Sequence, residues 1–174
     1  MPCTRMMPTM EERIVGSSLE PRRDHDFDAL FRGESPGVYR TLYAYTGGRA
    51  DVAEEAVAEA FARALAHAST IRDPLPWIYR TAFRLANEEL RRGSRQGDSA
   101  AMDAEIPPPE LQGVIEAIRY LSANQRAAIV LRHVLDLDMG EVASRMGIAT
   151  PTVRVHLHRG RKQLRRLLGD EEAD

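Results

Sequence analysis

The stretch MGEVASRMGIATPTVRVHL, from Met139 to Leu157, decides the fold of this 174-residue chain. It has the pattern of two short helices joined by a tight turn. Gly147 can adopt the left-handed backbone conformation that such a turn requires. Thr150 followed by Pro151 predicts an N-cap and then the first helical position. Apolar residues at helical spacing supply the packing, and we therefore predict a helix-turn-helix from Val142, Ala143, Met146, Ile148, Val153 and Leu157.

The second helix of this motif, extended to residue 168, separates an apolar face from a basic face. Its apolar stripe consists of Val153, Leu157, Gly160, Leu164 and Leu168. Residues 148–168 hold six arginines or lysines, two histidines and no acidic residue. A basic block on a periodic helix is typical of nucleic-acid binding, although a helical bundle with an arginine-rich exterior is the structural alternative. With the turn present as well, the pattern favours DNA binding.

A recognition helix in the major groove uses its N-terminal residues on base edges and later basic residues on phosphates. Arg154 could pair bidentately with guanine, and Val155 could contact a thymine methyl group. The sequence therefore predicts the start of this helix as the part that reads DNA.

Outside this motif the apolar residues also follow helical spacing, and no strand pattern competes with it. Helices are predicted over residues 51–68, 77–92, 111–121 and 124–135. A short helix beginning at Phe27 is expected to break at GESPG, residues 33–37, and a second piece then runs to Tyr45. The helix over 51–68 has an apolar stripe of Ala53, Val57, Ala60, Phe61, Ala64 and Leu65. The predicted fold class is all-α.

The helices divide into two small domains. Residues 25–95 form the first and residues 110–169 the second, and each is large enough for a helical core. Residues 96–109 between them contain Gly, Ser and Asp and end in three prolines, which predicts a flexible linker. Residues 1–24 and 170–174 are expected to be tails, the first of them disordered.

Composition excludes several classes of protein. No apolar run approaches the roughly 18 residues needed to cross a bilayer, and the N-terminus lacks the apolar core of a signal peptide. The single cysteine, Cys3, cannot form an internal disulfide, which suits a reducing compartment. We expect a cytoplasmic protein without membrane insertion.

No arrangement of residues typical of catalysis is present. The chain lacks a phosphate-binding glycine loop, a nucleophile elbow and an HExxH motif. His156 and His158 diverge on their helix, and the other histidines are isolated, so no metal site is predicted. We expect no enzyme activity and no cofactor.

Two further stretches complete a recognisable pattern. ADVAEEAVAEAFARALAHA, residues 50–68, is an acidic amphipathic helix, and PLPWIYRTAFRLANEELRR, residues 74–92, is a tryptophan-containing helix. Followed by the C-terminal helix-turn-helix domain, they resemble the extracytoplasmic-function (ECF) sigma factors of the sigma-70 superfamily. In that resemblance, residues 27–95 correspond to region 2 and residues 110–168 to region 4.

The resemblance implies core RNA polymerase and promoter DNA as partners, and for many members an anti-sigma factor. It implies polymerase contacts for the acidic residues Asp51, Glu54, Glu55 and Glu59. It implies −10 contacts for Asp73, Trp77, Arg80 and Arg84, and −35 contacts for Thr152, Arg154, Val155, His158, Arg159 and Lys162.

Three positions depart from the family pattern. Arg84 stands where asparagine is usual, Pro151 replaces a common glycine and Val155 replaces a small polar residue. These departures bear on the promoter sequence. Two alternatives stay open from the sequence: a stand-alone helix-turn-helix regulator, which would not bind core polymerase, and an inactive sigma-like adaptor, which would bind polymerase without starting transcription.

Overall fold

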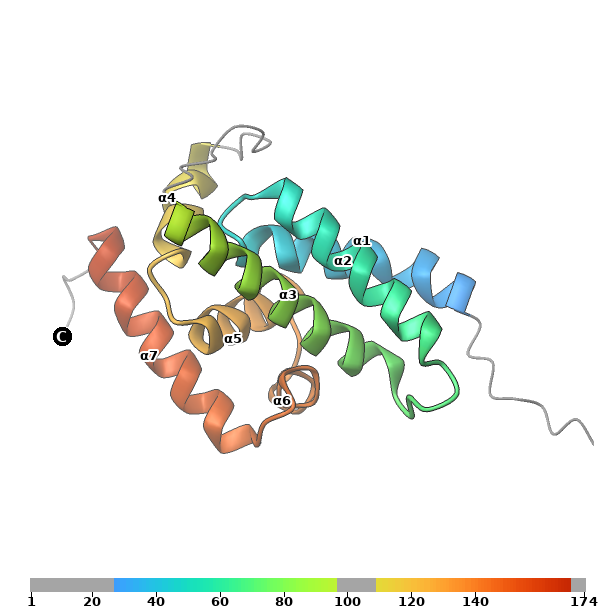
Figure 1. Cartoon of the computed structure of the whole chain (residues 1–174). Coiled ribbons are helices and arrows are strands. Elements are labelled where there is room, and N and C mark those ends of the chain that lie inside the picture. The colour runs from blue at the N-terminus through green and yellow to red at the C-terminus, as the bar shows by residue number, and fades with distance from the viewer. Residues whose placement is uncertain (1–26, 97–108, 170–174) are drawn as a thin grey trace, which may run out of the picture.

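The computed structural model describes residues 27–96 and 109–169, and within them it contains seven helices and no strand (Figure 1). The all-α prediction is confirmed. The predicted tails and most of the predicted linker lie outside the described residues. The helices are α1 (Phe27–Tyr45), α2 (Ala50–Ala66), α3 (Pro74–Gln96), α4 (Pro109–Ile118), α5 (Ala123–His133), α6 (Met139–Met146) and α7 (Thr150–Leu168).

Helix α1 is continuous, so the predicted break at residues 33–37 is wrong. Pro36 lies inside the helix. The proline ring fixes a φ that suits a helix, so the cost of Pro36 to the helix is mainly one missing backbone hydrogen bond and some steric strain. The buried side chains of Val38 and Leu42 anchor the following turns against the core. Tertiary packing therefore overrides the local cost of glycine and proline.

Helices α1, α2 and α3 pack against one another around large buried side chains. Leu42, Tyr45, Phe61 and Ile78 are among them. Five of the six residues predicted for the α2 stripe are buried, but Leu65 is 61% exposed, so its assignment to the core was wrong. Each four-residue step along a helix turns about 40° beyond a full revolution, which carries Leu65 away from the face that begins at Val57.

Helices α4 to α7 form the second group. The residues at the start of α6 specify that helix end strongly through local hydrogen bonds. Asp138 caps α6, because its Oδ1 accepts a hydrogen bond from the Glu141 backbone N–H at 2.8 Å. Glu141 Oε2 in turn accepts from the Asp138 backbone N–H at 2.9 Å. This reciprocal capping box satisfies two N–H groups at the start of α6, which begins at Met139, the first residue of the predicted motif.

The two groups of helices also contact each other. Helix α3 packs on α6, and α1 packs on α5 and α4. One cluster of buried apolar residues runs through both groups. In Figure 1, α3 crosses the centre of the molecule, with α1 and α2 on one side and α5, α6 and α7 on the other.

Candidate nucleic-acid interface

The turn between α6 and α7 has the geometry that the sequence predicted. Gly147 has φ 68° and ψ 33°, in the left-handed region, and its N–H contacts the last carbonyls of α6. The Ile148 N–H donates to the Ala143 carbonyl oxygen at 3.1 Å, which closes the turn. Val142 and Val153 are fully buried, one on each helix. Packing and backbone together therefore hold α7 across α6.

The N-terminus of α7 differs from the prediction in one respect. The N-cap is Ala149, not Thr150, and it offers no side-chain hydrogen bond. The helix thus begins one residue earlier than expected, and Pro151 lies within its first turn, where its missing N–H costs little. Thr150 was wrongly identified as the cap, but the position of the helix start is otherwise confirmed.

Helix α7 presents a continuous polar and basic face to solvent. All six residues expected at the −35 element are exposed on it: Thr152, Arg154, Val155, His158, Arg159 and Lys162. The opposite face is held by Val153, Leu157 and Gly160, which are buried. A Cβ on Gly160 would lie 3.0 Å from Ile129 Cγ1, so α7 lies close to α5 at this point. Close packing on one side fixes the direction of the basic face on the other.

His133 is a neighbour of this face that the sequence did not single out. The Arg161 guanidinium lies 3.5 Å from His133 Nε2. Partial burial, followed by the positive charges of Arg161 and Arg132, lowers the pKa of His133 below its usual value. Because arginine only donates hydrogen bonds, this geometry favours a neutral imidazole that accepts from Arg161.

A second candidate surface lies at the start of α3. Asp73, Trp77 and Arg80, all expected at the −10 element, line one open cavity of about 330 Å³ with His67 and Ile71. The Trp77 ring centre is 6.4 Å from that of His67. His67 and Ile71 precede the helix by several residues and carry no motif, so sequence reasoning missed them.

Arg84 lies apart from this cavity. It pairs with Glu88 at 3.2 Å on the exposed side of α3. It also lines a groove of about 280 Å³ between α3 and the second group of helices, together with Arg80 and Asn87. The structure thus brings three of the four expected −10 residues together and leaves Arg84 further along the helix.

The acidic residues of α2 do not form one site either. Glu55 and Glu59 line a groove of about 440 Å³ between α2 and α3. Glu54 is exposed outside the groove, and Asp51 forms a two-point ion pair with Arg49 at 3.0 and 2.5 Å. The hydrogen bonds from Arg49 hold the pKa of Asp51 below its usual range. Glu55 and Glu59 therefore share a groove, but Glu59 is paired with Arg63 at 2.6 Å, as Asp51 is with Arg49.

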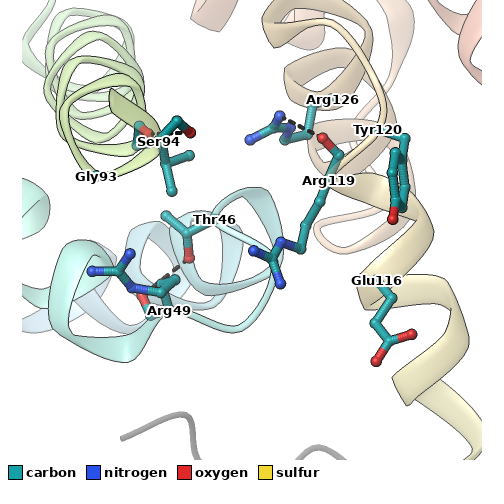
Figure 2. A pocket seen from close by; sticks show the side chains of 9 residues that line it. Thr46, Arg49, Gly93, Ser94, Glu116, Arg119, Tyr120 and Arg126 are labelled. Carbon is teal, nitrogen blue, oxygen red and sulfur yellow. Dashed lines mark hydrogen bonds between the residues drawn. The ribbon is translucent and has the colours of Figure 1, made fainter. Parts of the chain in front are cut away.

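An arginine-lined pocket of about 430 Å³ occurs where the two groups of helices meet (Figure 2). Arg49, Arg119 and Arg126 come to it from different parts of the chain. Arg126 donates to the carbonyl oxygens of Tyr45, Arg119 and Leu121, each at 3.2 Å. Burial, opposed in part by Tyr45, lowers the pKa of Arg126, and Arg119 lowers it further. This pocket was not predicted, because its residues are distant in sequence and follow no period.

Two further properties concern metal binding and membrane crossing. Within the described residues, no group of three or more His, Cys, Asp or Glu side chains is placed to bind a metal ion. Among the described helices, none combines the length and apolar character that crossing a membrane requires.

Comparison with known proteins identifies both groups of helices. A family model described as Sigma-70 region 2 matches residues 30–96, and one described as Sigma-70, region 4 matches residues 111–164. The chain thus has the two modules of a sigma factor, in sigma-factor order.

Similar proteins support the same assignment. The chain is 30% identical over 146 residues to the RNA polymerase sigma factor SigV of Bacillus subtilis, covering 77% of this chain and 86% of SigV. It is 29% identical over 170 residues to the ECF RNA polymerase sigma factor SigE of Mycolicibacterium smegmatis, covering 85% of this chain. The match spans 63% of SigE, which is less than two thirds of that protein.

A solved structure shares the fold. It is the co-crystal structure of the sigma factor RpoE with the anti-sigma factor NepR from Bartonella quintana. The TM-score is 0.65 at 23% identity, over 84% of this chain and 99% of that chain. The chain belongs to the sigma-70 family, as a member of its ECF group.

Proposed function

We propose that this chain directs core RNA polymerase to promoters by recognising −35 and −10 elements and by assisting the opening of the −10 duplex. The observation that carries the proposal is the pairing of two surfaces on one chain. One is the exposed basic face of α7, and the other is the cavity beside Trp77 on α3.

At the −35 element, α7 enters the major groove of duplex DNA. Thr152, Arg154 and Val155 lie in its first two turns, where a recognition helix meets base edges. Arg159 and Lys162 follow on the same exposed side, at positions suited to phosphates. The basic residues supply a salt-dependent attraction, and the first residues supply the choice of sequence.

At the −10 element, the cavity lined by Asp73, Trp77 and Arg80 receives an unstacked base. A half-buried indole offers a face on which a base can stack, and Asp73 can accept hydrogen bonds from an exposed base edge. Capture of an extruded base offsets the cost of unpairing it, so opening requires no ATP. Arg84, further along α3, is positioned for the backbone of the separated strand.

Core polymerase binds the outer side of α2 and α3. The groove that contains Glu55 and Glu59 has an apolar floor that includes Val52 and Leu85, and acidic residues at its edge. Such a surface fits a partner with an apolar ridge and basic residues that replace Arg63 at Glu59 and Arg49 at Asp51, while Glu54 is exposed beside the groove. Polymerase then holds both DNA-binding modules at a fixed separation, which raises the effective concentration of the second contact.

In this role the chain acts in the cytoplasm as an initiation factor, without catalysis of its own. Residues 25–95 and 110–169 are its two functional domains. The stand-alone regulator and the inactive adaptor are the outcomes that the following experiment separates from it.

The test is run-off transcription from a genomic promoter pool with the purified chain and core polymerase from a related bacterium. Transcripts that require the chain, with start sites that align to two shared promoter elements, are the expected result. Stable core binding without transcripts would indicate the inactive adaptor. Absence of core binding would indicate the stand-alone regulator.

A further inference from the structure

The arginine-lined pocket between the two groups of helices has no part in the proposed recognition of DNA. Its volume of about 430 Å³ lies within the roughly 300–1,000 Å³ that is typical of small-molecule sites in proteins. Its walls are the turn between α1 and α2, the end of α3, and the chain from α4 to α5 (Figure 2). A ligand held there would contact helices of both groups.

Arg126 brings a half-buried positive charge to this pocket. Its guanidinium donates to three neutral carbonyl groups and lies 5.0 Å from the centre of the Tyr45 ring. Its buried Nε has no hydrogen-bond partner within the described part of the chain. Because a cation that is partly removed from water is compensated better by an anion than by neutral groups, this environment favours an anionic ligand.

Arg119 adds a second positive charge close to the first. A Cβ on Gly47 would overlap Arg119 Cγ, so the glycine leaves room for the aliphatic part of this side chain across the turn after α1. Figure 2 shows the Arg119 guanidinium extending toward Thr46. The charge of Arg119 contributes to lowering the pKa of Arg126, so the two cations repel each other. An anion bound between them would relieve that repulsion.

Arg49 supplies the third guanidinium of the lining. Its Nε and Nη2 bind the two carboxylate oxygens of Asp51, and its Nη1 lies 3.8 Å from the position of a Cβ on Gly93, at the end of α3. The hydroxyls of Thr46 and Ser94, which also line the pocket, already donate to nearby backbone carbonyls. The arginines, rather than these hydroxyls, are therefore the groups suited to bind an anion.

Three guanidinium groups in one pocket match a phosphate chain. A guanidinium has a planar fork of N–H donors, which binds phosphate oxygens in pairs. Glu116 is the acidic side chain of the described lining, so positive charge is in excess there. A diphosphate or triphosphate carries several negative charges on adjacent groups and can engage more than one arginine at once.

Tyr120 and Glu116 lie together on one side of the pocket (Figure 2). Tyr120 is 70% exposed, but its backbone carbonyl accepts a hydrogen bond from Gln163 Nε2 at 2.8 Å, which holds the residue in place. An exposed ring is a stacking surface for a nucleobase, and a carboxylate beside it can accept hydrogen bonds from the N–H groups of that base. Since Glu116 would repel a bare phosphate, this side of the pocket favours a nucleotide over an inorganic anion.

We propose that this pocket binds a nucleoside di- or triphosphate, with the phosphates on Arg49, Arg119 and Arg126 and the base on Tyr120. The proposal goes beyond the function proposed above and does not depend on it. A ligand that contacts both groups of helices also stabilises the folded chain, because it binds the folded form and not the unfolded one.

Isothermal titration calorimetry of the full chain with GDP tests the site, at about 0.15 M salt to screen non-specific attraction. One saturable site per chain is expected. Inorganic pyrophosphate should bind at least about tenfold more weakly than GDP, because it lacks a base. Absence of binding by the folded chain at up to about 1 mM GDP would overturn the proposal. Equal affinities for GDP and pyrophosphate would overturn the role of the base.

Arg119→Met tests the phosphate contacts. It removes the charge but keeps an aliphatic side chain beside Gly47, and it should weaken binding of both ligands at least about tenfold. Arg132→Met is the matched control, because it changes the net charge equally and Arg132 pairs with Asp136 at 2.8 Å, away from the pocket lining. Circular dichroism checks that both variants keep their helix content. Equal weakening in the two variants would mean attraction by net charge alone and would refute the site.

Tyr120→Ala tests the contact with the base separately. The ring is exposed, so its removal should leave the core intact. GDP binding should weaken by about tenfold, while pyrophosphate binding should stay unchanged. An unchanged affinity for GDP would contradict stacking on Tyr120. Equal losses for both ligands would contradict it as well, because pyrophosphate has no base to stack.

Discussion

Arg80 and Ser144 are 64 residues apart in the chain, yet Arg80 Nη1 donates a hydrogen bond to the Ser144 carbonyl oxygen at 3.1 Å. One residue belongs to the helix expected to read the −10 element, and the other lies in the last turn of α6, the first helix of the helix-turn-helix. The two surfaces proposed to bind DNA are therefore directly connected by a hydrogen bond between their helices.

Arg154→Ala should reduce transcription from the cognate promoter by about tenfold or more, because a bidentate contact to guanine contributes about 1–3 kcal/mol of discrimination. Arg154 is exposed on α7, so the fold should be unaffected. Run-off transcription and a core-binding assay measure the two effects separately. Arg32→Ala, an exposed arginine of α1, is the control. Loss of core binding in Arg154→Ala would contradict its assignment to DNA.

Trp77→Ala should impair opening of the −10 duplex more than promoter binding. The indole lines the cavity at the start of α3, and base–aromatic stacking contributes about 1–3 kcal/mol per base. Permanganate reactivity of promoter thymines reports the opening. Trp77→Phe keeps an aromatic face and should retain most of the reactivity. If both variants open the promoter normally, the cavity does not hold a base.

Gly147→Ala should lower the free energy of unfolding by about 1–2 kcal/mol, because an alanine at φ 68° places its Cβ against backbone and the Arg80 side chain. Urea denaturation measures the change. Gly33→Ala is a matched control within α1, where an added Cβ meets nothing within 4 Å. That control should stabilise the chain by about 0.5–1 kcal/mol, since alanine favours a helix over glycine. Equal effects would show that the turn imposes no strain.

Stability should fall on acidification in a way that depends on His133. Burial and the nearby arginines lower its pKa in the folded chain below the ordinary 6.5. As the pH drops, the unfolded chain therefore binds the proton at a higher pH than the folded chain does. Folding stability is lost from about the ordinary pKa downward, until the pH falls below the pKa of the folded chain. Above pH 6.5 the residue has little effect.

Urea denaturation at several pH values tests this dependence. His133→Asn should flatten the decline below pH 6.5, whereas His158→Asn, exposed on α7, serves as the comparison. An unchanged decline in His133→Asn would assign the acid sensitivity to other groups.

The sequence was most informative where the signals were local. Gly147, the Asp138–Glu141 capping box and the apolar spacing of α7 specify the helix-turn-helix, because each acts within a few residues of itself. Local reasoning was wrong where packing overrode it. The GESPG segment is helical despite Gly33 and Pro36, and Leu65 is exposed despite continuing an apolar stripe.

The candidate sites also differ in how far local sequence patterns predict them. The basic face of α7 is exposed because the apolar residues recur at helical spacing and turn the opposite face to the core. The six expected −35 residues are all exposed on this helix. The cavity at Trp77 also includes His67 and Ile71, which come from the preceding loop and have no periodic relation to α3. Arg84 shares the helix with Trp77 but not the cavity, because seven residues carry it about 10 Å along the axis.

By itself, the sequence determined the helical class, the turn at Gly147 and the basic face of α7, since helix periodicity, capping and left-handed glycine are short-range effects. Only the tertiary structure decided that Arg80 binds Ser144, that Arg145 lies over Tyr79 and that Arg126 reaches the Tyr45 carbonyl. Those contacts join residues 64 to 81 positions apart. They depend on how two helical surfaces meet in space, and no local pattern in either helix encodes that meeting.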